Sequence, residues 1–499
     1  MRSQNLYPMI NNFKWLLFVS LAFVACDNND LEDDVVPLVP LTAGSADFSK
    51  YVAVGNSLTA GYSDNALFKA GQENSYPNIL AQQFAEVGGG EFRIPYLGDD
   101  NLGGLLFAGN IIQPTRLYFN GVGPVNVPGI PQNEVTQKLT GYFNNMGVPG
   151  AKVFHLVAPG YGNLAGVPTG QANPYFARFS SSNSATVLGD AMAQAPTFFS
   201  LWIGANDVLS YATSGGSGQN QLGNLDPSTY GGNDITDPQV FASVYSGLVD
   251  GLIGTGGAKG VIANIPYVTS IPYFRTVPYN AVPLPEANAA QLNAGYAQYN
   301  AGLQQAVGLG ALTVEEAARR KINFTAGQNA VVMIDSYLTD LSSFGIPSYR
   351  QATKDDLIIL TARTFIGTTV AGNPALINGV SVPLADNWVL SKDEVAEVKV
   401  AVDSYNAVIK SIATAKGLAF VDANAVLSTL YTSGLNYGNY NLTATYVTGG
   451  AFSLDGVHPG ARGYAFLANK FAEAINAQYG STLRGVNIGN YSTLYPQNL

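Results

Sequence analysis

The chain has 499 residues, of which 47% are hydrophobic and only 12% charged, whereas charged residues make up about 25% of an average soluble domain. A formal net charge of −10, without any cluster of Lys or Arg, argues against nucleic acid as a partner. One cysteine and two histidines, His155 and His458, exclude an internal disulfide framework, a thiolate metal cluster and a zinc site built from several histidines.

Residues 1–25 have the pattern of a signal peptide. Arg2 and Lys14 precede the apolar run "WLLFVSLAFVA", which is too short to cross a bilayer. The run ends at Cys26, and "LAFVAC" resembles a bacterial lipobox, although Phe23 stands where Leu, Val or Ile is usual. We therefore expect lipidation of Cys26 and attachment to a membrane. The alternative is an ordinary secretory signal followed by a chance cysteine.

Residues 26–47 are expected to form an acidic tether and linker. The segment "DNNDLEDD" holds five acidic residues, which repel one another and favour a solvated chain. It resembles the export signal of surface lipoproteins in some Gram-negative bacteria, which implies a lipid-anchored protein of the cell envelope, in the outer membrane and exposed at the surface. The Pro-containing segment that follows is an extended linker, so the folded part should begin near Phe48.

Strands and helices alternate over the rest of the chain. Short apolar runs predict strands at 50–54, 151–157, 195–204, 258–266 and 417–424, and apolar residues at helical spacing predict helices at 75–87, 238–253, 287–307, 392–416 and 461–479. Such alternation implies parallel strands with helices on both faces. We therefore expect an α/β fold, a three-layer α/β/α sandwich with a flavodoxin-like parallel sheet of about five strands and long loop insertions.

One domain is expected over residues 48–480, with residues 481–499 as a C-terminal tail. The insertion at about 309–390 could be a helical subdomain or a lid, since "TVEEAARRK" and "KDDLIILTART" both carry helical signals. Ligands of open α/β sheets bind beyond the carboxyl ends of the strands, so insertions there would form the walls of a substrate site.

Four short stretches carry residues suited to acyl chemistry. Ser57 in "VGNSLTAG" follows the first strand and opens a helix, and Gly150 lies in a turn. Asn206 in "IGANDV" follows a buried strand, where its amide can donate to an oxyanion. In "DGVHP", Asp455 can accept from the imidazole of His458. Each stretch alone is common, and a serine in this position is more often only a helix cap.

In this order, the four stretches resemble the motifs of the SGNH, or GDSL, hydrolase family of serine esterases and lipases. The resemblance covers roughly residues 48–480. Two features depart from the family pattern: Asn56 replaces the usual aspartate before the serine, and the interval from Ser57 to Gly150 is long.

The resemblance implies catalysis by Ser57, His458 and Asp455, with an oxyanion hole formed by Ser57, Gly150 and Asn206. It requires no cofactor and no metal. Asp226, Asp234 and Asp237 could bind calcium, but we interpret them as a plain acidic loop. His155 lies in the apolar run "KVFHLV" and is interpreted as a hydrogen-bonded structural histidine.

The predicted function is hydrolysis of carboxylic acyl esters by an esterase or lipase, with a lipid or an acylated glycan as substrate. A carbohydrate acetylesterase is the alternative within the same chemistry, because Tyr- and Asn-rich loops could stack on sugars. The third hypothesis is a surface binding protein that keeps the fold but has lost catalytic activity. The presence of Ser57, Asn206, Asp455 and His458 argues against it.

Overall fold

The computed structural model describes residues 40–499, and residues 41–499 form one compact unit. The predictions for the signal peptide, for Cys26 and for most of the tether lie outside the described residues. Within the described residues, no helix combines the length and the apolar character needed to cross a membrane.

A five-stranded parallel sheet lies at the centre of the fold. Its strands lie side by side in the order β6 (Asn145–Gly147), β1 (Tyr51–Gly55), β7 (Phe198–Trp202), β8 (Lys259–Ala263) and β17 (Ala419–Val421). Every neighbouring pair is parallel. The chain therefore winds in both directions from β1, as in a flavodoxin-like sheet, which confirms the predicted fold class.

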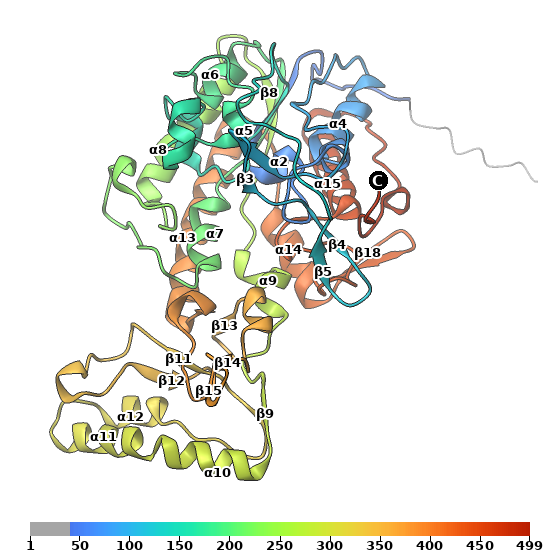
Figure 1. Ribbon diagram of the computed structural model, residues 1–499. Helices are drawn as coiled ribbons and strands as arrows, with labels where there is room; N and C mark the ends of the chain where they lie inside the picture. The colour runs from blue at the N-terminus through green and yellow to red at the C-terminus, as the bar shows by residue number, and fades with distance from the viewer. Residues whose placement is uncertain (1–39) are drawn as a thin grey trace, which may run out of the picture. The chain divides into compact units, whose positions relative to one another are not determined.

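Helices cover both faces of this sheet (Figure 1). On one face α4 (Tyr76–Ala85) packs against α15 (Ala461–Tyr479), and Tyr76 stacks on Phe471 with ring centroids 4.5 Å apart. On the other face lie α6 (Val187–Met192), α8 (Pro238–Ile253) and α13 (Lys392–Lys416), where Phe241 stacks on Tyr405 at 4.1 Å. These aromatic pairs bury large apolar areas against the sheet and stabilise the three layers.

Outside residues 282–390, the remaining helices and strands of the described chain are short. The α-helices are α2 (Ser57–Ala60), α3 (Lys69–Glu73), α5 (Pro174–Ala177), α7 (Asn206–Thr213), α9 (Pro272–Arg275) and α14 (Ala423–Thr432). Three two-stranded antiparallel sheets join β2 (Leu105–Phe107) to β3 (Asn110–Gln113), β4 (Leu117–Phe119) to β5 (Pro124–Asn126), and β18 (Leu435–Tyr437) to β19 (Tyr440–Leu442).

The strand predicted at 151–157 is wrong. Residues Val153–Val157 form a 3₁₀ helix, η1, and the second strand of the sheet is β6, immediately upstream. Gly147 lets β6 lie against α2, since a Cβ there would approach the Ala60 nitrogen to 2.3 Å. The turn at Gly150, with φ +81°, then directs the chain away from the sheet. The apolar residues of η1 are buried against α6 and α8 instead.

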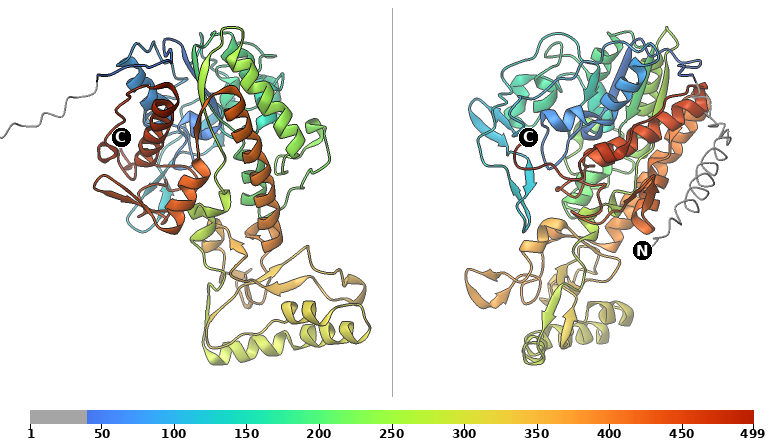
Figure 2. Two further views of the ribbon diagram at one scale, coloured as in Figure 1. Left: turned by 180° about the vertical axis from the view of Figure 1, so that it is seen from behind. Right: turned by 90° about the vertical axis from the view of Figure 1, so that its right-hand side faces the viewer.

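The predicted helix at 287–307 is two helices, α10 (Glu286–Gly295) and α11 (Ala297–Gly308). They open an insertion that lies beyond one end of the sheet and joins it through α13 (Figure 2). The insertion also contains α12 (Val314–Arg320), as predicted, and the small sheets β9 (Val282–Leu284) with β10 (Gly327–Asn329), β11 (Val332–Ile334) with β12 (Tyr349–Gln351), β13 (Leu357–Ile358) with β16 (Val389–Leu390), and β14 (Thr369–Val370) with β15 (Asn373–Ile377).

The segment "KDDLIILTART" is not an α-helix: it forms β13 and the 3₁₀ helix η6 (Leu360–Thr364). Leu357 and Ile358 are buried in a short antiparallel pairing with β16 rather than along a helical face. Whether the insertion acts as a lid stays a prediction.

Candidate active site

Ser57 is the first residue of α2, directly after β1. Asn56 precedes it as the N-cap, and its side-chain oxygen accepts a hydrogen bond from the Leu58 N–H at 3.0 Å. Asn is as good an N-cap as Asp, so the replacement of the usual aspartate keeps the turn that presents the serine. Both side chains are buried, with 1% of Asn56 and 6% of Ser57 exposed.

The structure brings Ser57, His458 and Asp455 into one hydrogen-bonded chain. The Nε2 atom of His458 lies 2.9 Å from Ser57 Oγ, and its Nδ1 atom lies 2.9 Å from Asp455 Oδ2. These are the three residues that the sequence motifs selected, although 401 positions separate the serine from the histidine. The arrangement lets the imidazole take a proton from the serine while the carboxylate orients the ring.

Asp455 is held ionised by its surroundings. Burial alone would raise the pKa of this carboxyl, but the neighbouring His458 and the hydrogen bonds from the N–H groups of His458 and Val457, both at 2.8 Å, hold the pKa below its usual value. Oδ1 also accepts from Ser453 Oγ at 3.0 Å, and Oδ2 from the Asn65 N–H at 3.0 Å. An ionised carboxylate at this point favours the imidazolium that forms during proton transfer.

Asp64 belongs to the same network and was missed in the sequence. Its Oδ1 accepts from the Leu454 N–H at 2.8 Å, and its N–H donates to Ser453 Oγ at 3.0 Å. Burial raises its pKa to about 7, and the nearby charge of Asp455 acts in the same direction. The signal was the tripeptide Ser-Asp-Asn after the helix, since Asp64 and Asn65 have positive φ angles, which Asp and Asn adopt more readily than most residues.

Ser57 and Asn206, two of the predicted oxyanion donors, line one cavity. Asn206 begins α7, and its Nδ2 donates to the Ala151 carbonyl at 2.9 Å, which leaves its second amide hydrogen for another acceptor. Asn206 lines the same cavity as Ser57 and His458. In the described part of the chain, the Ser57 N–H donates to no acceptor.

Gly150 lies in the turn after β6, next to the end of β1. The N–H of Val148 donates to the Gly55 carbonyl at 2.9 Å, and Asn173 Nδ2 donates to the Pro149 carbonyl at 2.8 Å. These bonds fix the two residues immediately before the glycine. Within residues 40–499 the Gly150 N–H has no acceptor, but Gly150 does not line the cavity that holds the other site residues.

Asp207, beside Asn206, has a structural position. It is fully buried, accepts from the Val153 N–H at 2.9 Å and from Thr236 Oγ1 at 2.7 Å, and burial raises its pKa to about 6. It thereby ties α7 to η1 and fixes the orientation of Asn206.

His155 lies in η1 and outside this network. Its Nδ1 accepts from the Lys152 N–H at 3.0 Å and its ring stacks on Tyr161 at 4.5 Å. Burial, together with the positive charge of Lys152, lowers its pKa to about 4, so the ring is neutral near pH 7. The structure thus agrees with the interpretation of His155 as a hydrogen-bonded structural residue.

Among the described residues, no group of three or more His, Cys, Asp or Glu side chains could hold a metal ion. The carboxylates of the acidic loop accept hydrogen bonds from their own segment instead. Asp226 accepts from the Ser228 N–H, Asp234 from the N–H groups of Gln219 and Gly231, and Asp237 caps α8 by accepting from Gln239 and Val240.

No protein-family model matches the chain, and no curated protein matches it. Solved structures that align with it include an acetylxylan esterase from Geobacillus stearothermophilus, at 13% identity over 86% of this chain and 95% of that one, with a TM-score of 0.29. An extracellular lipase from Streptomyces rimosus aligns at 12% identity over 86% and 98%, also with a TM-score of 0.29. Similarity at this level assigns neither a family nor an activity.

Proposed function

We propose that the chain is a serine hydrolase of the SGNH, or GDSL, type that cleaves carboxylic acyl esters. The observation that carries the proposal is the hydrogen-bonded chain from Ser57 Oγ through His458 to Asp455, with 2.9 Å at each step. These three residues lie beyond the carboxyl ends of the parallel strands, where open α/β sheets bind their ligands.

The geometry supports a two-step acyl transfer. Ser57 Oγ attacks the ester carbonyl while His458 Nε2 takes the serine proton, and His458 then gives this proton to the alcohol that leaves. A water molecule, activated by the same imidazole, cleaves the acyl-serine bond and releases the acid. The oxyanion of each tetrahedral intermediate is assigned to the N–H groups of Ser57 and Gly150 and to Asn206 Nδ2.

Hydrolysis of p-nitrophenyl esters by wild type and Ser57→Ala tests this proposal. We expect turnover by the wild type and loss of at least a thousandfold in kcat on substitution, since the nucleophile is removed. Ser210→Ala, on the outer part of α7, is the matched control and should retain full activity. An inactive wild type, or a Ser57→Ala variant as active as the wild type, would contradict a catalytic role and favour the surface binding protein.

A carbohydrate acetylesterase is the second candidate function. A second cavity, whose lining includes the rings of Phe154, Tyr161 and Tyr230, reaches Asn173, the residue that holds the turn next to Gly150. Aromatic rings of this kind can stack on sugars, so acetylated xylan belongs in the assay. Release of acetate from the polysaccharide, together with strict preference for p-nitrophenyl acetate, would favour this candidate.

We also propose that the mature chain is lipid-anchored through Cys26, which the lipobox-like stretch and the acidic tether support. Cys26→Ala should release the protein from the membrane fraction. If the variant stays with the membrane as the wild type does, the ordinary secretory signal or another attachment is correct.

A further inference from the structure

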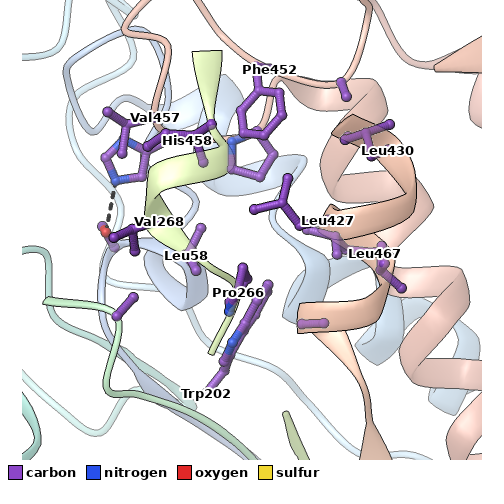
Figure 3. Close-up of a pocket in the computed structure, with 18 of the residues that line it drawn as sticks. Leu58, Trp202, Pro266, Val268, Leu427, Leu430, Phe452, Val457, His458 and Leu467 are labelled. Atoms are coloured by element: carbon purple, nitrogen blue, oxygen red, sulfur yellow. Dashed lines mark hydrogen bonds between the residues drawn. The ribbon is translucent and has the colours of Figure 1, made fainter. Parts of the chain in front are cut away.

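An apolar cavity extends from the Ser57–His458 pair (Figure 3). It contains about 860 Å³ of empty space, including the part open to solvent. Ser57, Asn206 and His458 line it where the proposed reaction takes place. Of the described residues that line the cavity, only His458 has a side chain that can become charged.

Three leucines form the wall that faces His458 across the cavity. Leu427 and Leu430 project from α14, and Leu467 projects from α15, on the opposite side from His458 and Val457 in Figure 3. Leu427 and Leu430 are each 7% exposed, so they are sheltered from bulk water. A wall of this composition offers no hydrogen bond to a sugar hydroxyl and favours hydrocarbon.

Polar contacts behind this wall keep it in place. Asn264, after β8, donates through Nδ2 to Asp422 Oδ1 at 2.8 Å and accepts from the Asn424 N–H at 2.8 Å, which fixes the start of α14. The Asn264 carbonyl accepts from Trp202 Nε1 at 3.0 Å, which fixes the indole that lines the cavity. The cavity is therefore preformed, and a ligand would not have to order it.

We propose that this cavity binds the hydrocarbon part of the acyl group, so that the protein prefers esters of medium-length, unbranched fatty acids over acetyl esters. The inference rests on the proposed ester hydrolase function and names its substrate class. The specificity-determining residues are Leu427, Leu430 and Leu467.

The order of the two chemical steps favours the acyl part over the alcohol. The alcohol leaves before water enters, so its subsite must open to solvent. The acyl group becomes bonded to Ser57 Oγ in the first step and is released only when water cleaves that bond in the second, so a sheltered cavity next to Ser57 can hold it throughout. An apolar cavity is also the environment in which each methylene of the chain contributes favourable transfer from water.

The decisive kinetic measurement is kcat/KM for p-nitrophenyl esters from acetate to decanoate, beside a series of acetates of linear alcohols. We expect kcat/KM to rise about fourfold per methylene of the acyl chain until the cavity is full, and to change little with the length of the alcohol. A dependence on alcohol length alone would assign the cavity to the alcohol and overturn the proposal. A maximum of kcat/KM at p-nitrophenyl acetate would also overturn the proposal.

Leu427→Trp tests the wall directly. The indole would fill the cavity, so the ratio of octanoate to acetate kcat/KM should fall by about tenfold or more. Val426→Phe, at a half-buried position of the same lining, is a second variant in case Leu427→Trp does not fold. Thr429→Trp adds the same indole on the exposed side of α14 and should leave the ratio unchanged. An unchanged ratio in folded Leu427→Trp and Val426→Phe contradicts the proposal.

Binding to the Ser57→Ala protein separates this inference from the proposed function. Calorimetric titration with sodium octanoate should show saturable binding, weakened about tenfold or more by Leu427→Trp in the same background, whereas sodium acetate should not bind measurably. If the wild type hydrolyses no ester but octanoate binds in this way, the proposed function fails and the hydrocarbon site stands. If esters are hydrolysed but octanoate does not bind, the inference fails and the proposed function stands.

Discussion

Asp64 has a carboxylate oxygen, Oδ2, that is buried and has no hydrogen-bond partner within the described residues. Its pKa of about 7, raised by burial, lies well above the value of 3.8 expected for the unfolded chain. In the folded state the group therefore keeps its proton over a range of pH in which the unfolded chain has lost it. Its contribution to stability is complete below pH 3.8 and is lost as the pH rises to about 7.

Asp64→Asn should consequently stabilise the protein in a pH-dependent way. The amide keeps the shape and the acceptor for the Leu454 N–H but cannot ionise. Relative to wild type, the variant should gain free energy of unfolding as the pH rises from about 4 to about 7, by a few kcal/mol in total, and gain no more above that. Urea unfolding at several pH values measures the difference, and a difference that does not vary with pH would contradict the raised pKa.

Asn206 allows a sharper test of the oxyanion assignment than the serine does. Asn206→Ala removes one donor that acts mainly in the transition state, so kcat should fall about a hundredfold or more while KM changes little. The lost bond to the Ala151 carbonyl should cost only about 1 kcal/mol of stability. Steady-state kinetics with a thermal unfolding control measure both effects. A rise in KM at unchanged kcat would place Asn206 in ground-state binding instead.

At the scale of elements, α13 shows how a local sequence signal specifies a helix. Ser391 and Glu394 form a capping box: the Glu394 carboxylate accepts from the Ser391 N–H at 2.7 Å, and Ser391 Oγ accepts from the Glu394 N–H at 3.4 Å. The helix then runs for 25 residues and ends at Gly417, whose φ of +62° suits a glycine.

Ser391→Ala should lower the free energy of unfolding by about 1 kcal/mol, the usual cost of losing an N-cap. Esterase kcat should not change, because Ser391 lies outside the proposed site. Ser404→Ala, at a half-buried position in the middle of the same helix, serves as control and should be neutral or slightly stabilising, since alanine favours a helix more than serine does. Equal effects of the two substitutions would show that the capping box contributes nothing.

Elements with local signals could be predicted, and elements set by tertiary contacts could not. Short stretches of sequence specify the capping box, the buried runs of β7 and β8 and the four site motifs. The second strand was predicted at 151–157 because an apolar run buried between helices looks like an apolar run buried in a sheet. The three residues of β6 carry no strand pattern, and their position depends on the contact of Gly147 with α2.

The same distinction applies within the site. Ser57, Asn206, Asp455 and His458 follow strands or precede a helix in recognisable motifs, so they could be predicted. Asp64 accepts a hydrogen bond from Leu454, the residue before Asp455, across 390 positions, and the apolar cavity depends on how α14 and α15 pack. Neither has a periodic pattern of its own, because pairing of distant segments decides both.

At the scale of the whole molecule, segments far apart in the chain meet at the loop 453–458, which contains Asp455 and His458. The Asp64–Asn65 turn bonds to one side of it, and the Tyr273 N–H donates to the Gly456 carbonyl at 2.9 Å. Leu360 of the insertion lies against Gly456, 3.0 Å from where a Cβ would stand. The insertion therefore packs against the loop 453–458, which we call the histidine loop, and supports it. No residue of 282–390 lines the described cavity.

Arg350 holds this insertion together. Its guanidinium is buried, bonds to Asp335 Oδ2 at 2.5 Å and binds both oxygens of Asp356 at 2.7 Å, and Asp356 also accepts from the Lys392 N–H at the start of α13. Removing one partner of such a buried group leaves uncompensated charges and costs about 3–5 kcal/mol. Arg350→Leu would leave the carboxylates of Asp335 and Asp356 buried without a positive partner.

We expect Arg350→Leu to open the insertion before the sheet. Hydrogen exchange should speed up in residues 327–390, while β1, β7 and β8 keep their protection. The kcat for ester hydrolysis should fall severalfold, because Leu360 would no longer support Gly456. Lys354→Ala is the matched control, since it breaks an exposed ion pair with Asp355 in the same segment and exposed pairs contribute only about 0–1 kcal/mol. If Arg350→Leu opened the insertion and left kcat at the wild-type value, the insertion would not support the histidine loop. Exchange that rises equally in the sheet and the insertion would instead show that the two unfold as one cooperative unit.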